Sequence, residues 1–297
     1  MGRLRYSYTC GVCNFKTKTI PCTKCTKYER HNNFDSGYKN VDDMIIASQS
    51  HAKDDRDFLE WIEFSQLRIL ETLDEGGFGT VYKAKWLDGL PMDASDVGRA
   101  WNRSHFNYVV AVKFFHNNKD FLKEFTNIYK MVRKFSEENE FPSNIVHYYG
   151  ATYDYDNEHY GIVMEYYSHT SLINHLTYNW QEIYWMEKLY ILRDISYGLH
   201  TLHSQNLIHG DLHSAKQISN GLRPKVYQED GIPRCFVNLM RNCWNSDVRS
   251  RPNAYTLYEK FNSWIEYSEA FEDMEWNITE PSIYHRKAVY TSRSWWQ

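Results

Sequence analysis

Apolar side chains recur every three or four residues over residues 185–204, and this repeat constrains the fold more than any other feature. The repeat consists of Trp185, Leu189, Leu192, Ile195, Leu199 and Leu202. Such spacing places these side chains on one face of an α-helix and predicts a buried helix. A short polar loop, residues 207–216 with the sequence LIHGDLHSAK, follows at once. A rigid helix followed by a loop can present a carboxylate as a general base, and Asp211 is the candidate.

Three glycines, Gly76, Gly77 and Gly79, interrupt an alternating apolar pattern over residues 69–86. The alternation predicts two strands, and the glycines predict the turn between them. Backbone amides can approach an anion closely where no side chain intervenes. The turn is therefore a candidate phosphate site.

Lys113 lies within a second apolar strand, predicted over residues 108–115. An ammonium in such a strand needs a partner, because burying an unpaired charge is costly. A helix is predicted next, and Glu124 lies on it. Its apolar positions, spaced for one helix face, are Phe121, Leu122, Phe125, Ile128, Tyr129 and Val132. Two further strands are predicted at residues 144–150 and 161–167.

The order of these motifs resembles that of the protein-kinase superfamily, and most closely its tyrosine-kinase-like branch. The resemblance implies that the glycine turn and Lys113, paired with Glu124, hold the phosphates of ATP. It implies that Asp211 is the catalytic base, within His-Gly-Asp-Leu in place of His-Arg-Asp-Leu. The sequence departs from the family at Asp74, which replaces the first glycine of the glycine-rich loop.

The resemblance also implies an adenine site. Met164 corresponds to the residue that gates the back of the pocket, and the backbone from Glu165 to Tyr167 corresponds to the hinge that meets the adenine edge. The implied ATP-binding residues are Gly76, Gly77, Gly79, Val81, Ala111, Lys113, Glu124, Met164, Glu165 and Tyr167.

The metal-binding segment of the family is missing from the sequence. No Asp-x-Gly follows Asp211, and Lys216 stands where the family carries a metal-binding Asn. Residues 218–224 instead resemble a turn found much later in the family's C-terminal lobe, so the activation segment and a central helix are missing too. Arg251 resembles the arginine that pairs with the glutamate ending that segment. The helix ending near His203 would then expose part of its apolar face, which we expect to bind a protein partner.

Three functions fit this pattern. The first is a pseudokinase that keeps an ATP pocket and has little or no phosphotransferase activity. The second is an active Ser/Thr/Tyr protein kinase whose sequence here lacks an internal segment, with Mg²⁺ expected only in the complete form. The third is a zinc-dependent interaction module on a catalytically inactive scaffold.

Four cysteines near the N-terminus form two C-x2-C pairs, Cys10 with Cys13 and Cys22 with Cys25, separated by eight residues. Four thiolates at this spacing suit a tetrahedral structural zinc site, and disulfides are disfavoured in a chain without a secretion signal. Four unconnected thiols are the alternative. Cys235 and Cys243 lie on apolar segments and are predicted to be in the core.

The composition is that of a globular protein, with 42% apolar and 24% charged residues. Residues 1–30 carry a net charge of +6 and the remainder −10. Such a basic head could contact nucleic acid or anionic lipid, but a solvated head is the preferred interpretation, because no aromatic-basic repeat runs through it. No apolar run is long enough for a membrane span and no signal peptide opens the chain, so cytoplasmic or nuclear localisation is expected.

The expected fold class is α+β: a protein-kinase-like bilobal fold preceded by a small four-cysteine zinc-binding element. The zinc element is assigned to residues 1–30 and a linker to residues 31–63. The kinase-like domain, residues 64–266, divides into a β-rich N-lobe (64–164) and a helical, incomplete C-lobe (165–266). Residues 267–297 form a C-terminal tail without a recognisable motif.

Overall fold

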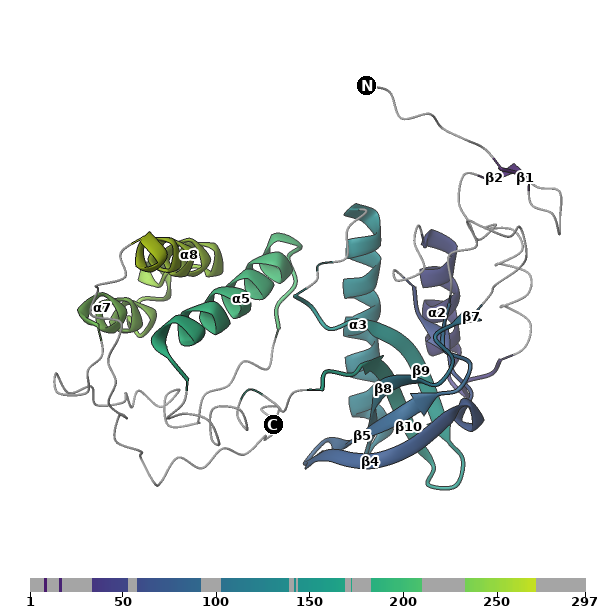
Figure 1. Ribbon diagram of the computed structural model, residues 1–297. Coiled ribbons are helices and arrows are strands. Elements are labelled where there is room, and N and C mark those ends of the chain that lie inside the picture. Colours follow the sequence, from purple (N-terminus) through teal and green to yellow (C-terminus); the bar gives the residue numbers. More distant parts are fainter. Residues whose placement is uncertain are drawn as a thin grey trace. The chain divides into compact units, whose positions relative to one another are not determined.

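The computed structural model describes residues 8–9, 16–17, 34–52, 58–91, 103–138, 142, 144–168, 172, 183–209 and 233–270. The chain divides between Tyr167 and Ser168 into two compact units. The first is built on a β-sheet and the second on helices (Figure 1).

A six-stranded sheet with the order β3-β9-β10-β8-β5-β4 organises the first unit. Its strands are β3 (Glu60–Trp61), β4 (Leu67–Gly76), β5 (Gly79–Trp86), β8 (Tyr108–Phe115), β9 (Tyr148–Asp154) and β10 (His159–Glu165). Neighbouring strands are antiparallel, except that β3 runs parallel to β9. The short elements are the 3-10 helix η1 (Phe64–Gln66) and the paired strands β6 (Leu90–Pro91) and β7 (Arg103–Ser104). The strands predicted around the glycines and Lys113 are therefore confirmed.

Successive side chains of β8 point to opposite faces of the sheet, as the period of a strand requires. Val110, Val112 and Phe114 pack into a core on one face. Phe115 packs with Ile162 on the other face, against helix α3 (Asn118–Glu138). Strand β8 is thus covered on both faces, which explains its nearly continuous apolar sequence.

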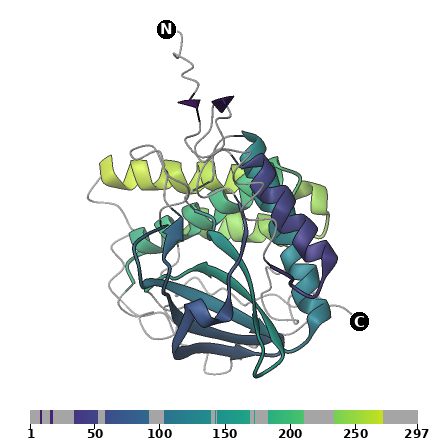
Figure 2. The ribbon, with the colours of Figure 1, turned by 90° about the vertical axis from the view of Figure 1, so that its right-hand side faces the viewer.

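Residues 31–63, predicted to be a linker from their polar composition, instead contain helix α2 (Lys39–His51) and strand β3. Val41 and Ile45 on α2 and Leu59 before β3 are fully buried in the core that α3 also lines. Helix α2 lies beside α3 (Figure 2). The prediction missed this helix because the segment is polar overall and only a few of its side chains are buried.

The second unit contains α5 (Trp185–Ser204), α7 (Arg234–Cys243), the 3-10 helix η4 (Val248–Ser250) and α8 (Ala254–Ala270). Helix α5 packs on α8, and the core consists of Leu189, Leu239, Phe261 and Ile265. The helix predicted over residues 185–204 is therefore confirmed as α5. The prediction that Cys235 lies in the core was wrong: Cys235 is exposed in the first turn of α7, whereas Cys243 is partly buried.

Helix α5 buries Leu189 and Ser196 within the described part of the second unit. Ile195 and Tyr197 on the same helix are 37% and 43% exposed. A protein partner for the apolar face of α5 remains a prediction. Among the helices of the described ranges, none has the length and apolar character needed to cross a bilayer.

Candidate functional site

The register of three central strands gathers four predicted site residues on one face of the sheet. Val81 of β5 lies opposite Lys113 of β8, and Ala111 of β8 lies opposite Met164 of β10. Residues directly opposite one another, and residues two apart along a strand, project from the same face. Val81, Ala111, Lys113 and Met164 therefore share one face, which is also the face that α3 covers.

Lys113 and Glu124 form the central ion pair of this face. The Lys113 Nζ lies 2.7 Å from Glu124 Oε2 and 3.0 Å from Oε1, so the ammonium donates to both carboxylate oxygens. The Nζ also lies 4.8 Å from the centre of the Phe115 ring, within the range of a cation–π contact. The two side chains are 24% and 37% exposed, so the pair contributes about 1 kcal/mol or less to folding. A cation held in place but still accessible is suited to binding an anion.

The glycine turn joins β4 to β5, and its three glycines differ in what the fold demands of them. A Cβ at Gly79 would lie 2.0 Å from the carbonyl oxygen of Phe114, so strand pairing requires glycine there. A Cβ at Gly77 would meet nothing within 4 Å, and one at Gly76 would only reach the Gly79 carbonyl oxygen at 4.0 Å. The fold thus leaves open space at Gly77 and beside Gly76, as close approach of a ligand to the turn requires.

The predicted hinge follows strand β10. The backbone amide of Glu165 donates to the carbonyl oxygen of His147 at 2.8 Å, so this amide is used within the fold. The Tyr167 hydroxyl donates to Glu165 Oε2 at 2.9 Å, and burial is the main cause that raises the pKa of Tyr167 to about 12. In the described part of the chain, the backbone amide of Tyr167 has no hydrogen-bond partner.

Residues 67–220, just over half of the chain, match a family described as protein tyrosine and serine/threonine kinase. The chain belongs to this family. The α+β architecture with its six-stranded sheet fits a kinase-like fold. No curated protein is significantly similar to the chain. The match begins at the first residue of β4, so α2 and β3 precede the matched kinase region.

Two residues, one beside Glu124 and one beside the glycine turn, carried no signal in the sequence. Tyr148 of β9 lies opposite Met164, and burial followed by the nearby Glu124 carboxylate raises the pKa of Tyr148 to about 12. His116 follows β8, and its Nε2 lies 3.1 Å from the carbonyl oxygen of Gly76 in the glycine turn. Both contacts depend on strand register, which no local motif encodes.

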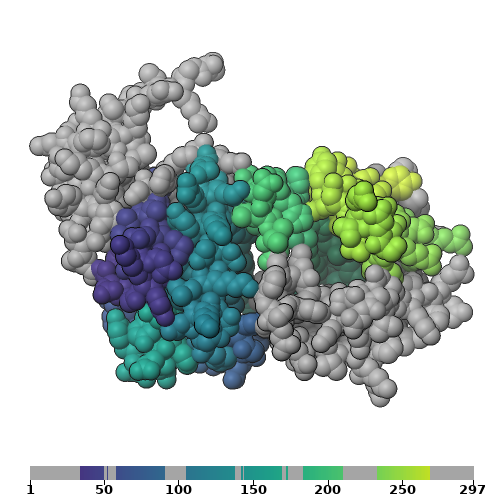
Figure 3. Space-filling model, turned by 180° about the vertical axis from the view of Figure 1, so that it is seen from behind, coloured from purple at the N-terminus to yellow at the C-terminus, as the bar shows by residue number. Residues whose placement is uncertain are grey.

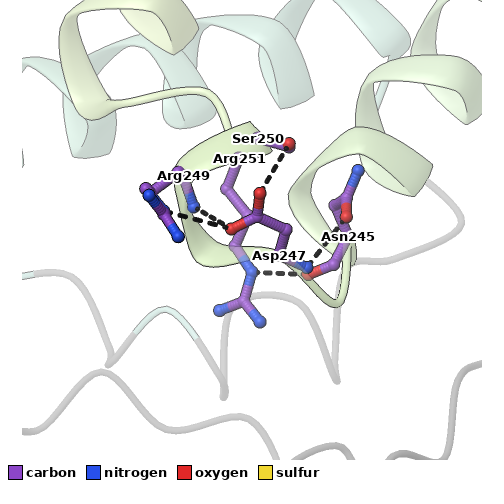
Figure 4. Close-up of polar contacts among 5 residues, drawn as sticks. All are labelled: Asn245, Asp247, Arg249, Ser250 and Arg251. Atoms are coloured by element: carbon purple, nitrogen blue, oxygen red, sulfur yellow. Dashed lines mark hydrogen bonds and ion pairs between the residues drawn. The ribbon is translucent and has the colours of Figure 1, made fainter.

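Arg251, predicted to have lost its glutamate partner, lies in the turn between α7 and α8 (Figure 4). Its Nε donates to the backbone carbonyl oxygen of Asn245 at 2.8 Å. The same turn is closed by Asp247, whose carboxylate accepts from the Arg249 amide at 3.0 Å and from the Ser250 hydroxyl at 3.3 Å. Arg251 therefore has a local role in connecting these two helices.

The predicted catalytic base Asp211 and the four N-terminal cysteines lie outside the described residues. Strands β1 (Tyr8–Thr9) and β2 (Lys16–Thr17) are described and pair antiparallel, with Thr9 opposite Lys16. Cys10 and Cys13 fall in the sequence that connects these two strands.

Proposed function

We propose that this protein is a nucleotide-binding pseudokinase of the tyrosine-kinase-like branch, with little or no phosphotransferase activity. The bidentate pair between Lys113 and Glu124, on the same sheet face as Val81, Ala111 and Met164, carries the proposal. A lysine held by a carboxylate is the group by which kinases bind nucleotide phosphates. The open space at the glycine turn adds support.

ATP would be held at its phosphates by Lys113 and the amides of the glycine turn, and at its base by the Tyr167 amide and the Glu165 carbonyl. When bound, it would supply a transferable phosphoryl group. Transfer depends mainly on positioning and on charge neutralisation by Mg²⁺. The sequence has no Asp-x-Gly after Asp211 and carries Lys216 in place of the metal-binding Asn, so both protein ligands for Mg²⁺ are missing.

Binding of a fluorescent ATP analogue to the full chain, with and without Mg²⁺, tests the first part of this proposal. Wild type should bind, and Mg²⁺ should change the affinity little. The substitution Lys113→Met should weaken binding about tenfold or more, because a charge-assisted contact to phosphate is lost. Lys130→Met is the matched control, since Lys130 is exposed on α3, the helix that carries Glu124. Equal binding by wild type and Lys113→Met would contradict the proposal.

Transfer of radiolabelled γ-phosphate by the same full chain tests the second part. Wild type should transfer no more phosphate than the Asp211→Asn variant. Ordinary kinase turnover, about 1–100 per second, would overturn the pseudokinase assignment.

Two alternatives have their own tests. Sequencing of the transcript across residues 210–225 decides whether an in-frame segment with Asp-x-Gly exists, which the active-kinase alternative requires. Deletion of residues 1–30 tests the zinc-dependent interaction module: unchanged affinity for every binding partner would exclude it.

A further inference from the structure

We propose that residues 34–52 and 58–62 together form a strap that positions helix α3, and through it holds Glu124 beside Lys113. The expected effect of the strap on nucleotide affinity rests on the proposed nucleotide-binding function. The contact of the strap with α3 can be tested without nucleotide. The strap precedes residues 67–220, which match the kinase family, so it is an addition to the matched region. Three sets of contacts carry the argument.

The strap is attached at its start to two elements of the sheet unit. The Tyr160 hydroxyl, from β10, donates to the backbone carbonyl oxygen of Ser36 at 2.5 Å. The Asn118 side-chain amide, at the first residue of α3, donates to the Tyr38 hydroxyl at 3.0 Å. The Tyr38 and Tyr160 rings are also packed, with centroids 5.2 Å apart. The strap thus touches the N-terminal end of α3 before α2 begins.

Helix α2 then packs along α3. Val41 and Ile45 are fully buried in one core with Phe121 and Phe125 of α3. Figure 3 shows α2 against α3 from the side opposite to Figure 1. Glu124 lies between these two phenylalanines in the sequence of α3, so a shift or rotation of the helix displaces its carboxylate.

The end of the strap is attached to the sheet. The Leu59 amide donates to the Ser48 hydroxyl at 3.0 Å, and the Gln49 side-chain amide donates to the Leu59 carbonyl oxygen at 3.0 Å. Strand β3 then pairs with β9, where a Cβ at Gly150 would lie 1.8 Å from the Glu60 carbonyl oxygen. Glycine at position 150 thus permits this close approach of the strap to the sheet.

These contacts attach the strap to α3 and to two strands of the sheet, β10 and β9. The strap therefore restrains the position of α3 relative to the sheet. An ion pair with a 2.7 Å contact tolerates little movement of the helix that carries the carboxylate. In kinases, phosphorylation of the activation segment and the positioning of this helix control whether the lysine–glutamate pair is in place. Here the strap holds the helix within the same unit, and the nucleotide pocket is formed without a signal from that segment.

Hydrogen exchange and nucleotide affinity of the full chain test the strap with three variants. Ile45→Ala removes packing against α3, and Tyr38→Phe removes only the hydrogen bond from Asn118. Leu67→Ala is the matched control, because Leu67 is buried in the core on the other sheet face. Amides of α3 should exchange about tenfold faster in Ile45→Ala than in wild type. In Tyr38→Phe the increase in their exchange rate should be smaller. Leu67→Ala should accelerate exchange in β4 and β5 instead.

Nucleotide affinity should fall about fivefold in Ile45→Ala and stay unchanged in Leu67→Ala. In a Glu124→Gln background, Ile45→Ala should have no further effect on affinity, because the strap acts through that carboxylate. If α3 exchange responds equally to Ile45→Ala and Leu67→Ala, the strap is overturned. If wild type binds no nucleotide, the proposed function fails, while the exchange comparison still decides the strap.

Discussion

The imidazole Nε2 of His116 lies 3.1 Å from the carbonyl oxygen of Gly76, and this contact links the end of β8 to the glycine turn. A carbonyl can only accept, so the Nε2 of His116 carries the hydrogen. The backbone amide of His116 also donates to the carbonyl oxygen of Phe78 at 3.1 Å. The turn is therefore attached at two points to the strand that presents Lys113.

We predict that His116→Ala weakens nucleotide binding about threefold, because an exposed hydrogen bond of this type contributes about 0.5–1.5 kcal/mol. Affinity for a fluorescent ATP analogue is the measurement. His159→Ala is the control, since the His159 ring lies 6.4 Å from the His116 ring and belongs to β10. An effect of the same size in both variants would show that the contact with Gly76 is not responsible.

The two glycine substitutions in the turn should separate folding from binding. Gly79→Ala should lower the free energy of unfolding by about 2–3 kcal/mol, since its Cβ would lie 2.0 Å from a backbone oxygen. Gly77→Ala should leave it within about 0.5 kcal/mol of wild type, because its Cβ meets nothing within 4 Å. Denaturant unfolding measures both. Equal destabilisation by the two substitutions would contradict the geometry of the turn.

The pair of Lys113 and Glu124 should matter little for stability. Both side chains are partly exposed, so Glu124→Gln should change the free energy of unfolding by about 1 kcal/mol or less. The same variant should lose nucleotide affinity, since Lys113 is no longer held. Denaturant unfolding beside a nucleotide titration makes the comparison. A loss of several kcal/mol without a change in affinity would give the pair a structural role.

Alkaline pH should destabilise the first unit through Tyr148, whose pKa burial and the Glu124 carboxylate raise to about 12. Between about pH 10 and 12 the unfolded chain loses the phenolic proton while the folded chain keeps it, so ionisation favours unfolding. The contribution of Tyr148 is complete below pH 10 and falls by about 1 kcal/mol between pH 10 and 11. Denaturant unfolding across this range should give a shallower decline for Tyr148→Phe than for wild type. Parallel declines would show that Tyr148 keeps an ordinary pKa.

The full chain should carry about one zinc per molecule, bound by Cys10, Cys13, Cys22 and Cys25. Metal analysis of freshly reduced protein is the measurement, and Cys10→Ser with Cys13→Ser should abolish binding. Cys235→Ser is the matched control, because Cys235 is an exposed cysteine of the second unit. Zinc retained by the double variant, or missing from wild type, would exclude this site.

The sequence by itself determined the elements and much of their chemistry. The alternating pattern predicted β4 and β5, the apolar run predicted β8, and the helical spacing predicted α3 and α5. The kinase-like order of motifs selected Lys113 and Glu124 before any distance was known. These features are local, because the period of apolar residues and the identity of a motif are both contained in a short stretch of chain.

Only the tertiary structure decided which elements meet. Strand register placed Val81, Lys113 and Met164 on one face and brought Tyr148 beside Glu124. Packing turned a polar segment, predicted to be a linker, into a helix with Ile45 fully buried. The local sequence of a strand or helix shows which of its sides is apolar. Which segment covers that side depends on contacts between residues far apart in the chain.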